Sequence, residues 1–234
     1  MVREIESRHS AMRQILHMKP ATAIIGAILL AAAASASAAN RRDLAQVLRG
    51  LQRHYDSTAS FTAKFGEEIS TPGAPVRRRS GTVYFRKPGR MRWDFAGDEP
   101  ETIVSDGTTL YNYDPGLNQV LEMPLKSAFK ANSATAFILG MGNVHRDFKA
   151  AFAPSDRAGG PIHLSLNPKE GGYRIEIAVD PKGYELEAVK FTDQLGNVTS
   201  IAFSDIHTNA AIANGRFAFK VPAGADIVTA PAAP

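Results

Sequence analysis

The side chains best suited to acid–base or metal chemistry are spread thinly along this sequence. Beyond residue 40 the imidazoles occur at His54, His145, His163 and His207. None has a second histidine or a carboxylate at the spacing that metal ligation or proton transfer requires, so we assign them structural or surface roles. The adjacent carboxylates Glu67-Glu68 and Asp98-Glu99 indicate solvated faces or turns, because neighbouring residues on a strand point to opposite sides.

The motifs that would mark common enzyme classes are absent from the sequence. It contains no G-x-S-x-G nucleophile elbow, no H-E-x-x-H zinc motif and no G-x-x-x-x-G-K-[ST] phosphate loop. Ser105 precedes Asp106-Gly107, which predicts a turn rather than a nucleophile. The chain has no cysteine, which excludes disulfides, thiolate metal sites and a lipid attached through cysteine. We therefore expect no catalytic residue, no metal, no cofactor and no enzymatic activity.

The charge balance also argues against a nucleic-acid partner. The formal net charge is only +4 at pH 7. A basic run, Arg77-Arg78-Arg79, lies in a stretch rich in proline and glycine and has no interleaved aromatic residues. This run predicts a solvated loop or, alternatively, a docking patch for an acidic partner.

The first residues have the pattern of a secretory signal peptide. Lys19 precedes an apolar run from Ala21 to Ala34, and the small residues 35–39 follow. The run is about fourteen residues long, shorter than the roughly 20 that span a membrane, so we expect no stable membrane insertion. The predicted division is a signal peptide over 1–38 and one exported domain over 39–234 with a short flexible tail.

The stretch from Gly81 to Pro115 predicts four short strands joined by tight turns. Its large apolar residues fall on alternate positions, which is the period-2 pattern of a half-buried antiparallel sheet. They are Val83, Phe85, Met91, Trp93 and Phe95. Asp106-Gly107 is a strong hairpin signal between two of these strands.

Two stretches have helical spacing instead. Residues 40–55 predict a first helix, with Asn40 as a possible cap and one apolar face. This helix either packs on the sheet or closes the mouth of a barrel. A second helical region is predicted between Pro124 and Pro154, where Phe137, Ile138 and Met141 are either ordinary core residues or the apolar underside of a movable lid.

Strands resume at Ile162 and continue to a last predicted strand over residues 217–221. The total is about eleven strands and about three helices, without the alternation typical of parallel βαβ units. The fold class is therefore α+β, with a strongly curved or barrel-like antiparallel sheet.

One face of this sheet is rich enough in apolar residues to line a container for acyl chains. The lining residues predicted from the strands are Val83, Phe85, Met91, Trp93, Phe95, Ile175, Ile177, Phe191, Ile201 and Phe203. On periodicity alone the alternative is a filled core that packs against the helices.

The order of motifs between Gly81 and Pro115 resembles the outer-membrane lipoprotein carrier protein family, LolA. The matching pattern is G-x-x-x-F-x-[basic]-P-x-x-M-R-W-D-F followed by P-E-T-I-V-S-D-G-x-x-L-Y-x-Y-D-P. Similarity continues through FTDQLGNVTSIAFSDI and FAFKVPAGADIV, so it covers most of the chain from Asn40 to Val228.

The resemblance implies an unclosed β-barrel capped by helices, located as a monomer in the periplasm. Such a carrier accepts acylated lipoproteins from an inner-membrane ABC exporter, shields their acyl chains and passes them to an outer-membrane receptor. It also implies that Phe137, Ile138 and Met141 contact acyl chains and that Lys87 couples the lid to the barrel. The family usually has arginine at that position, and its planar fork is not equivalent to an ammonium group. The alternative function is a periplasmic binding protein for another lipid or apolar small molecule.

Overall fold

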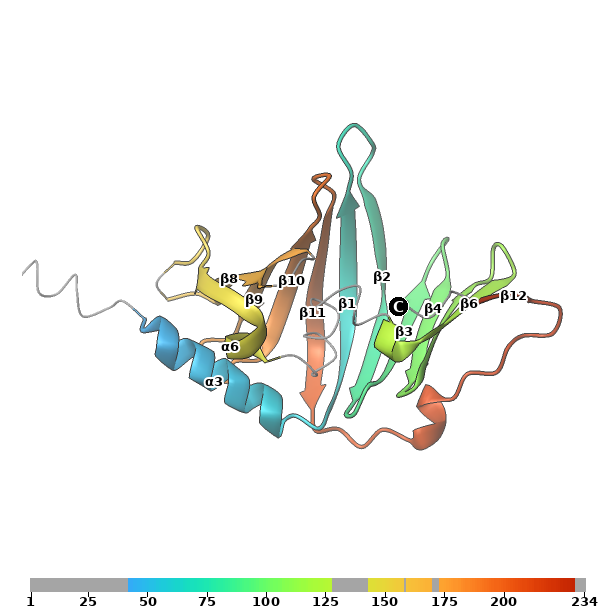
Figure 1. The fold of residues 1–234 in the computed structure, drawn as a ribbon, viewed down its shortest axis with the longest axis horizontal. Coiled ribbons are helices and arrows are strands. Elements are labelled where there is room, and N and C mark those ends of the chain that lie inside the picture. Colours follow the sequence, from blue (N-terminus) through green and yellow to red (C-terminus); the bar gives the residue numbers. More distant parts are fainter. Residues whose placement is uncertain (1–41, 128–142, 158, 170–172, 230–234) are drawn as a thin grey trace, which may run out of the picture. The chain divides into compact units, whose positions relative to one another are not determined.

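The computed structural model describes residues 42–127, 143–157, 159–169 and 173–229, nearly all of them in the compact unit Asp43–Pro234. Figure 1 shows these elements in chain order. The helices are α3 (Leu44–Ser57), α6 (Val144–Asp147) and the 3₁₀ helix η2 (Asn214–Phe217). The strands are β1 (Ser60–Ser70), β2 (Arg77–Arg86), β3 (Arg90–Ala96), β4 (Glu101–Asp106), β5 (Thr109–Asp114), β6 (Gln119–Pro124), β7 (Phe148–Phe152), β8 (Ile162–Pro168), β9 (Arg174–Val179), β10 (Leu186–Thr192), β11 (Val198–Thr208) and β12 (Asp226–Thr229).

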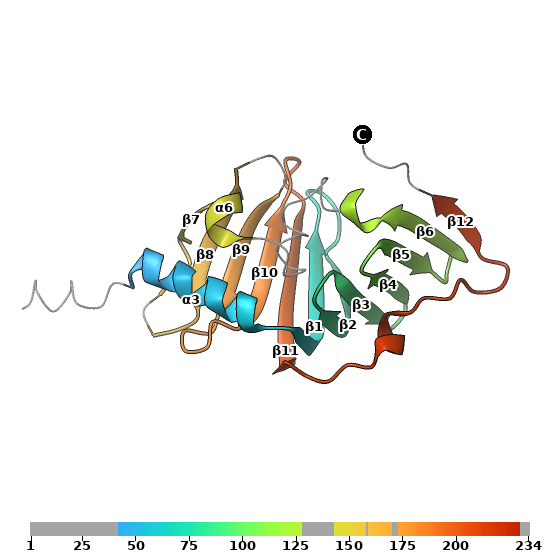
Figure 2. The same cartoon turned by 60° about the horizontal axis from the view of Figure 1, so that its bottom comes forward.

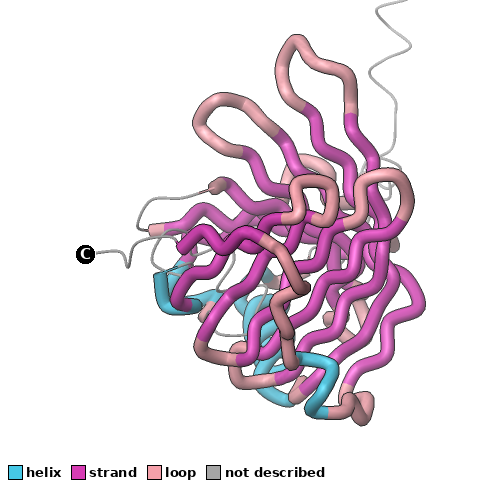
Figure 3. The backbone as a smooth tube through the Cα atoms, turned by 90° about the vertical axis from the view of Figure 1, so that its right-hand side faces the viewer, coloured by secondary structure: helices cyan, strands magenta, loops and turns pink. Residues whose placement is uncertain are grey.

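All twelve strands belong to one curved sheet with the order β12-β6-β5-β4-β3-β2-β1-β11-β10-β9-β8-β7. Figure 3 shows them following one another around the curve. Strands β7 and β12 are the two ends of this order and do not pair with each other, so the sheet is unclosed. The predicted fold class is thus confirmed. One detail differs, because β12 pairs with β6 in parallel.

The cross-strand register explains why one face of the central strands is apolar. Val83 of β2 lies opposite Trp93 of β3, which lies opposite Ile103 of β4. Directly opposed residues share a face of the sheet. The predicted alternation therefore gathers the apolar side chains on the inner face, and the residues between them point to the outer face.

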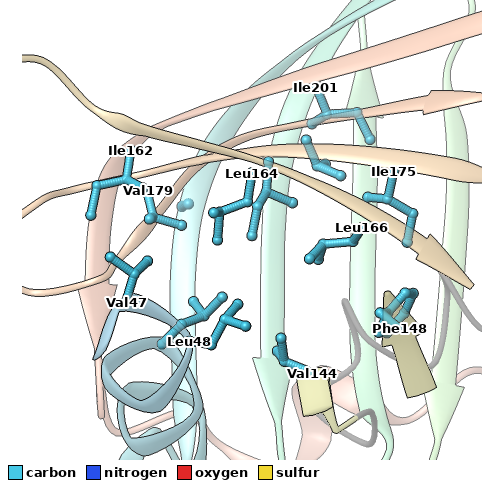
Figure 4. Packing of buried hydrophobic residues seen from close by; sticks show 14 of the residues in the cluster. Val47, Leu48, Val144, Phe148, Ile162, Leu164, Leu166, Ile175, Val179 and Ile201 are labelled. Carbon is cyan, nitrogen blue, oxygen red and sulfur yellow. The ribbon is translucent and has the colours of Figure 1, made fainter. Parts of the chain in front are cut away.

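Helix α3 packs on the inner face over β8, β9 and β10, as Figures 1 and 2 show from two directions. The helix begins four residues later than Asn40, because Asp43 is its N-cap and accepts a hydrogen bond from the backbone N–H of Ala45 at 3.0 Å. Figure 4 shows the resulting core, in which Val47 and Leu48 of the helix face Ile162 and Val179 of the sheet.

Two segments have a different structure from the one predicted. Residues 148–152 form strand β7 within the stretch predicted as helical, and their Phe-x-Ala-x-Phe pattern has the period of a strand. Residues 217–221 do not form the predicted last strand; η2 ends at Phe217, and β12 follows only at Asp226. Alternating aromatic residues can also belong to an extended segment that packs on a sheet without joining it.

That segment covers part of the outer face of the sheet. Phe217 is 2% exposed, and Val104 and Val120, which point outward from β4 and β6, are fully buried. The ring of Phe219 stacks on Tyr111 with 5.1 Å between centroids. The sheet therefore has a second, smaller apolar contact on its outer side.

The three consecutive arginines are not a loop, because they begin strand β2 and pair with glutamates of neighbouring segments. Arg79 is bound by Glu67 at 2.7 Å and also by Glu101 on the inner face, where Glu67 is only 9% exposed. Arg77 pairs with Glu99 and Arg78 with Glu68, and these side chains are exposed. The interpretation of Glu67 as part of a solvated face is wrong, because only its neighbour Glu68 points outward.

The carboxyl-terminal half of α3 is fixed to the turn between β9 and β10. Gly50 lies so close to Tyr184 that an added Cβ atom would lie 2.3 Å from the ring. One helical turn further on, His54 hydrogen-bonds the backbone of Gly183, and Glu185 lies near enough to interact with it electrostatically. Burial lowers the pKa of His54, and the contacts with Gly183 and Glu185 offset part of this effect.

Replacing Glu67 by alanine is expected to lower the free energy of unfolding by about 2 kcal/mol, since Arg79 would lose one of its two charged hydrogen-bond partners. Glu68→Ala is the matched control, because its exposed pair with Arg78 contributes about 1 kcal/mol or less. Urea titration of both variants measures the difference. Equal losses would show that the inner network has no special role in stability.

A further prediction concerns pH. Because the pKa of His54 is lower in the folded than in the unfolded chain, the unfolded chain binds the proton more tightly. Stability should therefore fall as the pH drops through the ordinary histidine pKa of about 6.5. His54→Gln should remove part of this fall in thermal melts at pH 7.5 and 5.5, while the exposed control His145→Gln should not. Identical pH profiles for the native chain and His54→Gln would contradict the assignment.

Candidate functional site

The inner face of the sheet gathers the residues that the sequence predicts for a ligand container. Among the ten that lie in strands, seven are at most 8% exposed, and Trp93, Phe191 and Phe203 are half-buried around them. The seven are Val83, Phe85, Met91, Phe95, Ile175, Ile177 and Ile201. The other three predicted residues, Phe137, Ile138 and Met141, lie outside the described residues.

Aromatic rings connect the middle of this face. Trp93 lies 4.8 Å from Phe65 and 6.1 Å from Phe203, measured between ring centroids. Phe61 continues the row to Phe85 at 5.6 Å. Phe61 and Phe65 are not among the predicted lining residues, although they alternate along β1 as Val83 and Phe85 do along β2.

Helix α3 and the short helix α6 cover part of the face. Val47, Leu48 and Leu51 of the helix and Val144 of α6 are at most 9% exposed, and they pack in the same cluster as the strand residues. The side-chain oxygen of Gln52 accepts a hydrogen bond from the backbone N–H of Val144 at 3.0 Å. The helix is therefore tied both to the sheet and to the short helix that precedes β7.

A cavity of about 50 Å³ lies between the carboxyl end of α3 and strands β1, β2 and β11. Its apolar wall is formed by Phe61, Phe85, Leu186, Phe203 and Ile206, and its polar wall includes His54 and Lys87. A space of this size accommodates a few water molecules but not an extended hydrocarbon chain. A long apolar ligand could enter this cavity only if its walls moved.

Lys87 stands at the edge of this cavity and bonds the helix. Its ammonium group donates to the backbone carbonyl oxygen of Tyr55 in the last turn of α3, where the helix dipole favours a cation. Its own backbone N–H donates to the carbonyl oxygen of Ala59 at 2.9 Å. Burial lowers the pKa of Lys87, and Asp56 partly opposes this shift. The structure thus joins the β2–β3 turn directly to the end of the covering helix.

Polar groups mark the limits of the apolar face. At the end near the β1–β2 hairpin, the guanidinium of Arg79 lies 4.0 Å from the centre of the Phe95 ring and is held there by Glu67 and Glu101. On β5, the side-chain oxygen of Asn112 is buried, has no hydrogen-bond partner among the described residues and stands opposite Ile103. Neither feature was predictable from the sequence alone, because both depend on cross-strand neighbours.

Apolar side chains, rather than clusters of polar ones, dominate the inner face. Within the described ranges, no three side chains of the types that bind metals come close enough to hold an ion. No helix in that part of the chain is long and apolar enough to cross a membrane. What the face offers is a broad apolar surface with the cations Arg79 and Lys87 at its edges, which suits a hydrocarbon ligand.

Comparison with known proteins identifies relatives along most of the sequence. The chain is 33% identical over 184 residues to the outer-membrane lipoprotein carrier protein of Methylobacillus flagellatus, covering 77% of this chain and 88% of that one. It is 35% identical over 150 residues to the protein of the same name from Cupriavidus pinatubonensis, covering 64% and 69%.

The fold is shared more widely than the sequence. A crystal structure of an uncharacterized conserved protein from Thermus thermophilus superimposes with a TM-score of 0.51 at 13% identity, covering 81% of this chain and 100% of that one. A family model described as outer membrane lipoprotein carrier protein LolA matches residues 56–220, well over half of the chain. The chain therefore belongs to the LolA family of outer membrane lipoprotein carrier proteins.

Proposed function

We propose that this chain is a periplasmic carrier that shields the acyl chains of lipoproteins on the inner face of its sheet. The observation that carries the proposal is the apolar cluster from Val83 to Ile175, which Phe61 and Trp93 connect to Phe85 and Met91, on a sheet that does not close. In this proposal, the carrier receives its cargo from an inner-membrane exporter and delivers it to an outer-membrane receptor. The family name, outer membrane lipoprotein carrier protein, supports only the kind of cargo and its destination.

The burial energies favour displacement of helix α3 by the acyl chain of the cargo. Burying one methylene group contributes about 0.8 kcal/mol, so a chain of about fifteen methylenes gains on the order of 12 kcal/mol. Fully burying an aliphatic side chain such as Leu51 contributes about 1.5–3 kcal/mol. One acyl chain therefore offsets the loss of the few contacts that Val47, Leu48 and Leu51 make with the sheet.

Because these burial energies are similar, release of the acyl chain needs an additional interaction that stabilises the closed arrangement. Once α3 has been displaced, the acyl chain lies in an environment as apolar as the core that it replaces. The bond from Lys87 to the carbonyl of Tyr55 exists only when the helix is seated. It therefore favours the closed arrangement and helps to expel the cargo.

The single tryptophan of the chain gives a direct test. A synthetic lipopeptide with brominated acyl chains should quench the fluorescence of Trp93, which lies beside Phe203 on the inner face. Phe203→Glu should weaken this binding by at least about tenfold, because the carboxylate would lose its hydration against the hydrocarbon. Ala202→Glu is the matched control, since the neighbouring side chain points outward and is exposed.

Thermal unfolding must first show that both variants fold. If Phe203→Glu does not fold, Phe203→Ser takes its place in the binding measurement. Quenching of Trp93 in a folded Phe203→Glu variant as strong as in the native chain would refute the assignment of the inner face. A free brominated fatty acid is the second ligand. If it binds as tightly as the lipopeptide, the chain is a general lipid-binding protein and not a lipoprotein carrier.

For Lys87, the expected effect concerns release. Lys87→Leu should slow transfer of the brominated lipopeptide to acceptor vesicles by about tenfold, which corresponds to the loss of a charge-assisted bond of about 1.5 kcal/mol. Lys87→Arg should keep the native rate, because a guanidinium can also donate to the carbonyl of Tyr55. Recovery of Trp93 fluorescence measures the rate. Equal rates for lysine and leucine at this position would remove Lys87 from the mechanism.

A further inference from the structure

A group of arginines lies on the outer face of the sheet, where β2 ends and β3 begins. Arg86 and Arg90 stand directly opposite each other on these strands. Helix η2, which contacts β3 and β4, adds Arg216 beside them. In Figures 1 and 2, η2 is the short orange-red helix at the ends of these strands. Like charges directly opposed across a strand pair are unfavourable, so this arrangement requires an explanation.

The groups around these arginines leave much of their hydrogen-bonding capacity unused. The side-chain oxygen of Asn214 accepts from Arg86 at 2.6 Å and from Arg90 at 3.4 Å, so two cations share one neutral acceptor. Arg86 also donates to the carbonyl of Ile212 at 2.8 Å and lies over the ring of Phe217. Arg216 lies over the ring of Tyr84 at 4.6 Å. A guanidinium has five N–H donors, and most of those on Arg90 and Arg216 have no protein partner in the described part of the chain.

One carboxylate faces the group but is already engaged. Asp106 stands opposite Arg90 on β4, and its Oδ1 atom accepts from the backbone N–H groups of Thr108 and Thr109 at 2.7 and 2.9 Å. It interacts electrostatically with Arg90 without reaching ion-pair distance. Along the ranges that the structure describes, no carboxylate pairs with Arg86, Arg90 or Arg216.

Other arginines of the sheet show the contrast. Arg77, Arg78 and Arg79 each pair with a glutamate, and Arg92 binds Asp94 at 2.8 Å. Among the described residues, the group at the β2–β3 turn thus differs from these arginines by having no ion-paired carboxylate. A planar guanidinium fork fits a carboxylate in a bidentate geometry, so closely spaced carboxylates would complete it.

The surroundings favour a protein partner over a membrane surface. In the described residues, large exposed apolar side chains lie at Val76, Leu117, Tyr173, Leu195, Ile227 and Val228, and none belongs to the β2–β3 turn or to η2. A membrane-binding patch would combine basic residues with apolar side chains that insert between the lipids. Here the basic group stands without them.

We propose that Arg86, Arg90 and Arg216 form a docking site for an acidic segment of a protein partner, with at least two closely spaced carboxylates. Arg86 precedes Lys87, whose side chain lies at the cavity and bonds the end of α3. A partner seated on the outer face would therefore contact the turn that holds the cover. This role rests on the proposed function, but binding of the acidic segment is measurable without any acyl ligand.

The probe is a fluorescein-labelled hexaglutamate peptide, followed by fluorescence anisotropy with the full domain at low salt. Arg90→Gln/Arg216→Gln should raise the Kd by about tenfold, because two unpaired guanidiniums are lost. Arg86 is kept, since its bonds to Ile212 and Asn214 hold the carboxyl-terminal segment. The control Arg53→Gln/Lys149→Gln removes the same charge from two exposed positions elsewhere and should change the Kd by less than about twofold.

Equal weakening in both double variants would mean that the peptide senses only net charge, and it would overturn the site. Failure of the hexaglutamate peptide to bind the native chain would also overturn the proposed site. Phosphatidylglycerol vesicles are the second probe. If vesicles bind through Arg90 and Arg216 and the peptide does not displace them, the site binds a membrane surface and the proposal of a protein partner is wrong. Quenching of Trp93 by the brominated lipopeptide is measured on the same variants. If quenching fails while peptide binding persists, the carrier function is wrong and the docking site stands.

Discussion

The structure depends on keeping one apolar face of an open sheet away from water. A closed barrel would shield its interior with its own strands, but here β7 and β12 are free ends. Part of that shield is a helix laid on the sheet, with Leu51 fully buried and Val47 and Leu48 beside it. Under the proposed function this cover must exclude water and still give way to a hydrocarbon chain, and the small number of side chains that the helix contributes suits both requirements.

Charged residues keep this face separate from the outer one. The alternation of a strand places Glu67 inside and Glu68 outside, so consecutive carboxylates have opposite surroundings. Inside, Glu67 and Glu101 hold Arg79 over Phe95 and end the apolar surface with a satisfied network. Outside, Glu68 forms an exposed pair that contributes little. Two glutamates are therefore expected to contribute differently to the free energy of unfolding, according to the face of the sheet on which each lies.

Strand periodicity predicted the curved sheet and its apolar face, because alternation is a local property that Val83, Phe85 and Trp93 display in the sequence alone. It failed at residues 217–221, which alternate like a strand but do not pair with the sheet. Period alone therefore does not decide whether a segment joins a sheet. The ion pairs of Arg77 and Arg79 were also unpredictable, since Glu99 and Glu101 come close only through the register of β2, β3 and β4. Side-chain alternation in the central strands was accessible, and contacts that depend on the register between strands were not.

The turn after β2 is where the two faces meet. Arg86 points outward to the carboxyl-terminal segment, and Lys87, the next residue, reaches the carbonyl of Tyr55 on the covering helix. Coupling between distant sites requires an element with two arrangements, and binding at either site must shift the equilibrium between them. Helix α3 is that element if it is displaced by cargo, and the turn is its direct link to the outer face. A partner that pulled this turn by a small distance would break the bond to Tyr55 without entering the apolar face.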